Sequence, residues 1–442
     1  EGAKVLQFAS LNALVHGGVA IGVTLTDALF LTEIGVDQLP YIYLFTPLIM
    51  LVYVPLFGRL VDRWGAQKAF SSSLVLLAVV SAILYFATSS TPGAAVYFGA
   101  KFAAIVAAIA LYTVYWSFTD GFFDIQDGKR LFALFSAGGA AGAMVGGTLV
   151  GVMSERGLVE PLFLVWAALA LLTIPLLIVI GRKHEQLEEE EEPQGSATGG
   201  SRKLGSYIPL FATSVAIMLI LGAIAEYQYL AIFAQRGDAA EISTLLGQMY
   251  AVTGAINLVV NLFLFNRMVL TLGVPTVAMV TPLAFLAAFT YLLVDHGIAS
   301  AIVAFIVVQS VLESIDLNNQ NFLYNAFPAD LKQRVRTAFE GLGEPLATAV
   351  GGAILLIAVS RLSPAQLSTI GVGLSAIVVL VVLLLKGGYL RSMVRNLKDS
   401  WLDLSQPSEK LLVGLTRTEI EQLRERASGE SDIGNVHAAI RI

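Results

Sequence analysis

The sequence predicts an all-α membrane protein whose twelve transmembrane helices form two halves of six. The first observation is the composition: of 442 residues, 56% are hydrophobic and 14% are charged, and the mean hydropathy is +0.75. Soluble proteins carry about 25% charged residues. The second observation is a series of apolar stretches of roughly 20 residues, the length that crosses a membrane. The third is a single polar segment that divides these stretches six and six.

The apolar stretches follow one another along the chain at about 5–31, 41–60, 69–89, 93–119, 130–153, 160–181, 207–234, 242–266, 274–294, 298–327, 335–360 and 366–388. Between the sixth and the seventh, "GRKHEQLEEEEEPQGSATGGSRK" (181–203) is first charged and then rich in Gly and Ser. Such a segment cannot bury a core and predicts a solvated linker. We therefore predict an N-terminal half over 1–181, a linker over 182–204, a C-terminal half over 205–390 and a tail over 391–442.

The distribution of Lys and Arg predicts how the protein is oriented. The loops after spans 2, 4, 6, 8 and 10 hold thirteen of these residues, and the opposite loops hold three, Arg156, Arg236 and Arg361. Loops rich in Lys and Arg stay on the cytoplasmic side. We therefore expect both termini and the linker to be cytoplasmic, in the inner (plasma) membrane of a bacterium.

Several classes of function are disfavoured by composition. Cysteine is absent, so disulfides and thiol chemistry are excluded, and the four histidines lack the spacing of a metal site. The net charge of −6 argues against a nucleic-acid partner. No nucleophile motif or nucleotide-hydrolysis loop occurs, so we expect neither an enzyme nor a bound cofactor or metal.

The segment between spans 2 and 3, "GRLVDRWGAQK" (58–68), carries the most specific motif. Gly58 allows two helices to approach closely and Gly65 permits a tight turn. Asp62 can accept a hydrogen bond from an arginine such as Arg63 or cap a neighbouring helix, and Lys68 completes the pattern. This segment resembles the signature loop of the major facilitator superfamily, which implies the major facilitator fold, transport by alternating access and a gating role for the loop. The alternative is a loop of ordinary basic residues that only sets topology.

Two glycine-rich stretches indicate internal symmetry between the halves. "KRLFALFSAGGAAGAMVGG" (129–147) and "RVRTAFEGLGEPLATAVGG" (334–352) match at a shift of 205 residues, as expected of two transporter repeats. "GAMVGG" also resembles the span-5 motif of facilitator antiporters, with Ala143 in place of their proline. Small residues let helices pack closely, and we predict this role for Gly138, Gly142, Gly146, Gly351 and Gly352.

Polar residues collect on spans 1, 4, 7 and 10, the four that line the central cavity of the superfamily. The candidate substrate or ion site comprises Asn12, His16, Asp27, Lys101, Tyr112, Tyr115, Glu226, Gln228, Gln309, Glu313, Asp316 and Gln320. At 100° per residue, the last four fall within about 80° of one another. We predict that Glu313 and Asp316, near mid-membrane, bind a coupling proton or a cationic group of the substrate. Two structural alternatives remain open: Lys101 pairing with Asp27, and His16 as a packing residue.

The stretches "RLFALFSAGGAAG", "RVRTAFEGLGEPLATAVGG" and "NFLYNAFP" most resemble the ATP/ADP translocase-like branch of nucleotide carriers. That resemblance implies exchange of ATP, ADP or related nucleotides as the small-molecule substrate. Members of this branch use several intramembrane lysines to bind the phosphates. Here the predicted cavity contains one lysine, Lys101, and four acidic residues, Asp27, Glu226, Glu313 and Asp316. This balance favours proton-coupled transport of another polar or cationic solute. A membrane sensor or scaffold derived from a transporter is a further alternative.

The last part of the chain predicts a contact with the membrane surface and a cytoplasmic extension. "KGGYLRSMVRNLKDSWLDLS" (386–405) is basic and amphipathic, which suits membrane lipid at the cytoplasmic face. Residues 408–442 read as helix, turn and helix, and "GNVHAAIRI" resembles the second helix of a HEAT-type repeat. One such repeat cannot bury its apolar face alone. We expect either a continuation into an α-solenoid or other cytoplasmic domain or partner, or a helical hairpin docked on the bundle.

Overall fold

The computed structural model describes residues 2–123, 125–184, 207–327, 335–336, 339 and 343–398, and within these ranges the regular structure is entirely helical. Eleven of the described helical segments are long and apolar enough to cross a membrane, so the chain is an integral membrane protein. They confirm the predicted spans one to ten and twelve. The predicted eleventh span is described as a helix from Glu344 and is shorter, at 16 residues. The predicted linker from residue 185 and the predicted tail from residue 399 lie outside the described residues.

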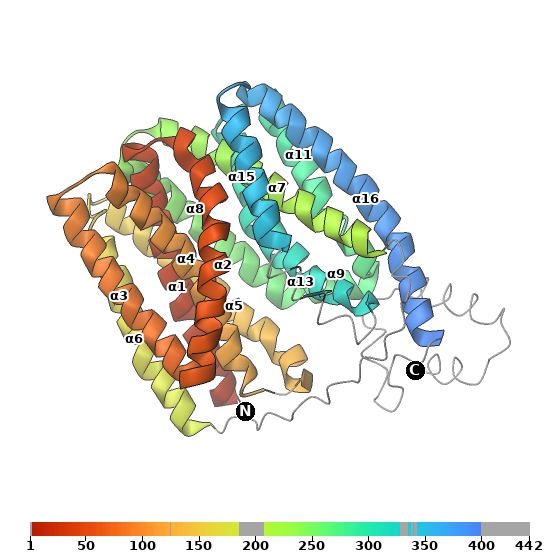
Figure 1. Cartoon of the computed structure of the whole chain (residues 1–442), viewed down its shortest axis with the longest axis horizontal. Helices are drawn as coiled ribbons and strands as arrows, with labels where there is room; N and C mark the ends of the chain where they lie inside the picture. Colours follow the sequence, from red (N-terminus) through yellow and green to blue (C-terminus); the bar gives the residue numbers. More distant parts are fainter. Residues whose placement is uncertain are drawn as a thin grey trace.

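The first six spans form one half of the bundle (Figure 1). Gly35 ends the first with a φ of 96°, Gly65 separates the second and third with a φ of 81°, and Gly157 precedes the sixth with a φ of 71°. These left-handed conformations cost little in glycine, so each turn occupies few residues. The elements are α1 Gly2–Glu33, η1 Val36–Gln38, α2 Leu39–Trp64, α3 Ala66–Ser90, α4 Ala94–Asp120, α5 Ile125–Ser154 and α6 Leu162–Lys183.

The second half differs because two of its spans contain π-helical segments, η3 and η4. In a π-helix the backbone hydrogen bonds join residues five apart instead of four. Its elements are α7 Tyr207–Phe233, η2 Ala234–Arg236, α8 Ala239–Val259, η3 Val260–Leu264, α9 Phe265–Leu272, α10 Val274–Val277, α11 Val280–Val294, α12 Ile298–Ile306, η4 Val307–Asp316, α13 Leu317–Leu323, η5 Tyr324–Ala326, α15 Glu344–Val359 and α16 Pro364–Lys398.

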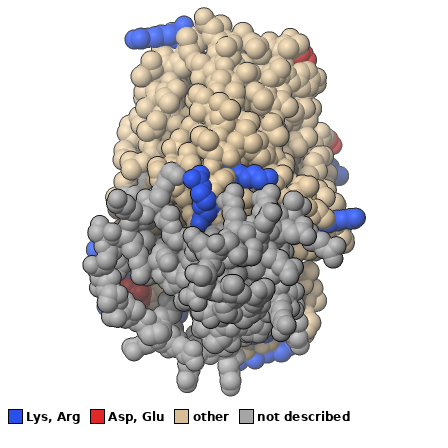
Figure 2. All heavy atoms as spheres, turned by 90° about the vertical axis from the view of Figure 1, so that its right-hand side faces the viewer, with Lys and Arg blue, Asp and Glu red and all other residues tan. Residues whose placement is uncertain are grey.

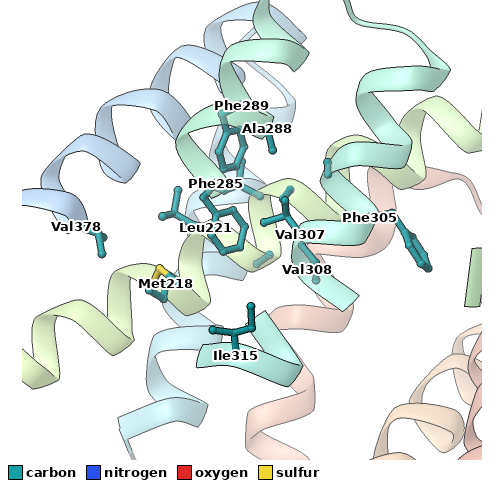
Figure 3. Packing of buried hydrophobic residues seen from close by; sticks show 14 of the residues in the cluster. Met218, Leu221, Phe285, Ala288, Phe289, Phe305, Val307, Val308, Ile315 and Val378 are labelled. Carbon is teal, nitrogen blue, oxygen red and sulfur yellow. The ribbon is translucent and has the colours of Figure 1, made fainter. Parts of the chain in front are cut away.

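Each half has its own buried apolar core. The core of the first half joins α1, α3, α4 and α6 around large side chains such as Phe70, Phe118 and Trp166. The core of the second half joins α7, α11, η4 and α16, and Figure 3 shows part of it around Leu221 and Phe285. The second core also takes in the start of α2, so apolar packing continues from one half into the other.

The halves meet through α2 against α15 and through α5 against α8. A Cβ atom at Gly352 would lie 2.7 Å from the backbone nitrogen of Leu44, and one at Gly254 would lie 2.7 Å from that of Met144. Both distances are shorter than van der Waals contact, so glycine allows these backbones to approach. Figure 1 shows both described chain ends at the end of the bundle that carries the turn at Gly65, and we call this the terminal end. We call the other end of the bundle the opposite end.

The outer surface carries the apolar side chains expected against lipid. Leu380 and Leu384 of α16 are each 62% exposed, and Val52 of α2 is 71% exposed. Figure 2 shows one face of the molecule, whose described part consists mostly of residues that are neither basic nor acidic. In a bilayer these side chains contact lipid tails, which are as apolar as leucine. Their exposure therefore does not indicate a protein partner.

Candidate functional site

A buried ion pair joins α1 to α4 within the first half. The Lys101 ammonium donates to the Asp27 carboxylate, and the two side chains are only 2% and 5% exposed. The pairing of these two residues, one of the alternatives from the sequence, is confirmed. Because both charges are withdrawn from water, each depends on the other for stabilisation.

The second half brings Glu226 of α7 into electrostatic range of this pair. Glu226 is attracted by Lys101 and repelled by Asp27, so one ammonium group serves two carboxyl groups. The hydroxyl of Tyr43, on α2, lies beside the Glu226 carboxyl but makes no well-formed hydrogen bond in the described structure. The contact therefore connects the two halves through charged and polar groups whose hydrogen bonds are incompletely satisfied.

Glu313 of η4 lies farther along the same interface. It is solvent-accessible, is in electrostatic range of Glu226, and faces Tyr112 of α4 across the boundary between the halves. Tyr112 is 37% exposed, and its ring packs edge-on against His16 of α1, with the ring centres 4.3 Å apart. Tyr250 of α8 is in range of both Tyr112 and Glu313. Accessible polar groups in the middle of apolar spans are typical of substrate and ion paths.

We call these residues the interface cluster: His16, Asp27, Tyr43, Lys101, Tyr112, Glu226, Tyr250 and Glu313. It contains three carboxyl groups and one ammonium group, and that ammonium group is already paired. The cluster can therefore accept protons or a positive group, and an anion would meet repulsion. Among the described residues, no three His, Asp or Glu side chains form a set that could hold a metal ion.

The prediction that Asp316 and Gln320 share a face with Glu313 is wrong. The carboxyl of Asp316 accepts from the Gln320 side chain at 2.8 Å, and both residues line a pocket wholly within the second half. The spacing of 100° per residue fails here because η4 is π-helical over Val307–Asp316, and its wider turns rotate Asp316 away from the interface. Only Glu313 of the predicted pair belongs to the interface cluster.

Gln309 does not belong to the interface cluster but contacts a residue next to it. Its side chain donates to the Tyr229 hydroxyl at 3.4 Å, and its backbone carbonyl accepts from the Asn257 side chain at 2.9 Å. Tyr229 is in electrostatic range of Glu226, so Gln309 supports the cluster from behind. The Asn257 contact also ties α8 to the π-helical segment that carries Glu313.

Three other predicted cavity residues, Asn12, Tyr115 and Gln228, have their side chains buried inside one half, so their place in a cavity stays a prediction. Asn12 donates to the backbone carbonyl of Phe135 at 2.8 Å, and the Tyr115 hydroxyl donates to that of Phe8 at 3.2 Å. Gln228 accepts from the Ser368 hydroxyl at 2.7 Å and is 1% exposed. Each joins two helices of the same half, a packing role that polar residues commonly have inside membrane bundles.

The predicted signature segment lies at the terminal end. Asp62 and Arg63 belong to the last turn of α2 and Lys68 to the first turn of α3, and all three are exposed, so the loop proper is reduced to Gly65. A Cβ atom at Gly58 would have no neighbour within 4 Å, so the predicted close approach at this glycine is absent. The gating role of the segment stays a prediction.

The glycine packing predicted for α5 is confirmed. Cβ atoms at Gly138, Gly142 and Gly146 would overlap the backbone of α1 at Ala9, Ala13 and Gly17 in turn. Gly352 packs on α2, whereas Gly351 only makes ordinary contact with α7, 3.4 Å from the Cβ of Ala223. The spacing of four residues places three glycines along one helix face, and that face packs along α1 from Ala9 to Gly17.

Sequence reasoning missed Tyr43 and Tyr250. Tyr43 lies in span 2 and Tyr250 in span 8, outside the four spans expected to line a cavity. They reach the cluster because α2 and α8 lie at the boundary between the halves. The signal available was the tyrosine content of otherwise apolar spans, since buried tyrosine hydroxyls need partners.

Comparisons with known proteins agree with this architecture. The profile described as Major Facilitator Superfamily matches residues 8–308, well over half of the chain. The chain belongs to the major facilitator superfamily. No curated protein matches it.

Solved structures of other facilitators share the fold. The crystal structure of a mutant of the nucleoside transporter NupG has a TM-score of 0.60 at 15% identity and covers 86% of this chain and 99% of its own. An auto inhibited POT family peptide transporter has a TM-score of 0.60 at 12% identity, covering 88% of this chain and 97% of its own. The xylose transporter XylE from E. coli, inward open, has a TM-score of 0.56 at 12% identity, covering 86% and 94%. At these identities the likeness of this facilitator to them concerns the fold alone.

Proposed function

We propose that this facilitator is a secondary active transporter that carries a small neutral or cationic polar solute by alternating access, coupled to protons held at Glu313 and Glu226. The observation that carries the proposal is the composition of the interface cluster, three carboxyl groups against one paired ammonium group. A carboxyl group at the boundary between two moving halves can exchange a proton or bind a cationic solute whenever that boundary opens.

The contacts between the halves support alternating access. At the opposite end, Ser154 of α5 donates to the Ser243 hydroxyl of α8 at 2.8 Å, and the Tyr227 hydroxyl of α7 donates to Asp37 at 3.4 Å. Glu313 and Tyr112, deeper in the bundle, are accessible. Rocking of the halves would separate the serines and bring the terminal ends together. With Lys and Arg concentrated in the even loops, we propose that the terminal end is cytoplasmic.

Nucleotide exchange, the function implied by the translocase-like stretches, competes with this proposal. A nucleotide carries several negative charges, and the interface cluster offers it one ammonium group that already neutralises Asp27. The charges of the described residues therefore favour a cationic or neutral solute over ATP or ADP.

The first experiment is thermal stabilisation of the purified protein by a panel of ATP, ADP, AMP, amino acids, sugars and organic cations. A ligand at 100 times its dissociation constant stabilises the folded state by about 2.7 kcal/mol, which is readily measured. We expect stabilisation by a cationic or neutral member of the panel. Stabilisation by ATP or ADP alone would overturn the charge argument and support nucleotide exchange.

Transport is then measured in proteoliposomes with the stabilising ligand. Glu313→Gln is expected to abolish uphill uptake driven by a pH gradient and to leave exchange of labelled for unlabelled solute in place, because the amide cannot release a proton. The matched control is Glu160→Gln, an exposed carboxyl group outside the cluster. Unchanged uphill uptake in Glu313→Gln would refute the role of Glu313, and binding without flux would identify a receptor.

A further inference from the structure

A second polar site lies inside the second half, away from the interface cluster. It is a pocket bounded by α7, η4, α13 and α16 and completed by Ala278 and Pro282. Nine of its twelve lining residues are apolar, and the other three are Ser214, Asp316 and Gln320. Two of the apolar lining residues, Met218 and Val378, are labelled in Figure 3. We call this space the Asp316 pocket.

Among the described residues, no positive side chain pairs with the Asp316 carboxyl. It is 8% exposed, and within the described ranges its sole hydrogen-bond partner is the Gln320 side chain, 2.8 Å from Oδ2. No Lys, Arg or His of the described chain lines the pocket. Lys386, which directly follows the lining residue Leu385 in α16, donates to the Thr276 hydroxyl at 3.1 Å. An ionised carboxylate in apolar surroundings is costly unless a positive charge neutralises it.

The pocket has room for that charge. Its volume is about 20 Å³, enough for one water molecule or one small ion. Besides the carboxylate, the Ser214 hydroxyl, which donates to the Phe211 carbonyl at 2.8 Å, keeps its lone pairs available. The amide of Gln320 now donates to Asp316, and when a cation lies between them it can turn its oxygen inward in exchange for that hydrogen bond, since the two orientations of an amide are nearly equivalent in shape. The donor set is all oxygen, which suits hard cations.

Charge and size select the cation. One carboxylate neutralises one positive charge, whereas a divalent ion would leave an excess charge among nine apolar side chains. A bare proton would neutralise the carboxylate too, but it needs no free space beside it. A pocket that admits about one water-sized sphere has room for an alkali cation such as Na⁺ or K⁺.

We propose that the Asp316 pocket binds one alkali cation, for which Na⁺ is the probe, through Asp316, Ser214 and Gln320. The π-helical segment ends at Asp316 and directs this residue into the second half while Glu313 faces the first. Sites of this kind often coincide with π-helical segments. The inference does not depend on the proposed transport function, because Na⁺ binding can be measured without any solute.

The test measures the thermal midpoint of the full purified chain in NaCl, KCl and choline chloride at equal ionic strength and constant pH. We expect a saturable increase of the midpoint with NaCl and none with choline chloride, whose cation is too large for the pocket. Equilibrium dialysis with radioactive Na⁺ should give one ion bound per chain. Equal midpoints in all three salts, or stabilisation by lowered pH without a Na⁺ effect, would overturn the proposal.

Variants separate this pocket from the interface cluster. Asp316→Asn should abolish both the Na⁺-dependent shift and the binding of radioactive Na⁺, whereas Glu313→Gln, three residues away on the other face, should retain both. Ser214→Ala keeps the carboxylate and should weaken Na⁺ binding, because one of the three oxygen donors is lost. This milder variant decides the question if Asp316→Asn does not fold. Loss of Na⁺ binding in Glu313→Gln with retention in Ser214→Ala would refute the assignment.

Discussion

The ion pair between Asp27 and Lys101 gives the sharpest test of the site. Lys101→Met would leave Asp27 buried without a cation and would also remove the attraction that Glu226 receives. Breaking a buried ion pair by removing one partner costs about 3–5 kcal/mol. Asp27→Asn should fall at the lower end of that range, since Lys101 keeps Glu226 as a partner, and Lys101→Met should fall at the upper end.

The double variant Asp27→Asn/Lys101→Met separates the pair from its surroundings. Replacing both partners of a buried pair removes both charges together, so it destabilises less than leaving one charge unpaired. Its stability should therefore lie above that of Lys101→Met, with a coupling energy of about 2 kcal/mol or more between the two positions.

The assay is the thermal midpoint in detergent, measured under one set of conditions for all variants. We expect the wild type to melt highest, Asp27→Asn and the double variant to follow close together, and Lys101→Met to melt lowest. The control is Arg361→Met, which removes an exposed basic residue. A midpoint for Lys101→Met equal to that of Arg361→Met, or additive losses in the double variant, would show that the pair does not stabilise the fold.

Three further predictions concern packing, motion and pH. Gly142→Ala should destabilise the protein by about 1–3 kcal/mol, because the new Cβ would overlap the backbone carbonyl of Ala13 in α1. Gly99→Ala, in open space on α4, should not lower the midpoint in the same melting assay. The hydroxyls of Ser154 and Ser243 lie 2.8 Å apart, and the chain has no cysteine. Cysteines at both positions should form a disulfide on oxidation that stops transport until it is reduced. Oxidation should not change transport by either single cysteine variant. Burial, with smaller effects from nearby basic groups, lowers the pKa of His184 below its ordinary value of 6.5. The unfolded chain then binds this proton more readily, so stability should fall as the pH drops through about 6.5, and melting of His184→Gln should lack that component.

The sequence by itself determined the helical spans and part of their packing. Eleven predicted spans correspond to described helices because crossing a membrane depends on a local property, the hydropathy of about 20 consecutive residues. Gly142 and its neighbours at intervals of four predicted close packing of this helix, and the structure shows that the partner is α1. Asp27 and Lys101 could be paired because helix direction gave their depths.

Beyond the pair of Asp27 and Lys101, the tertiary structure alone decided which polar residues share a site. Glu313 and Asp316 are three residues apart and belong to different sites, because the π-helical turns of η4 change the direction of successive side chains. Tyr43 and Tyr250 reach the interface cluster only because α2 and α8 lie at the boundary between the halves. Hydrogen-bond register and helix neighbours both depend on contacts between residues far apart in the chain, such as Asn257 with Gln309, and a local pattern carries no information about them.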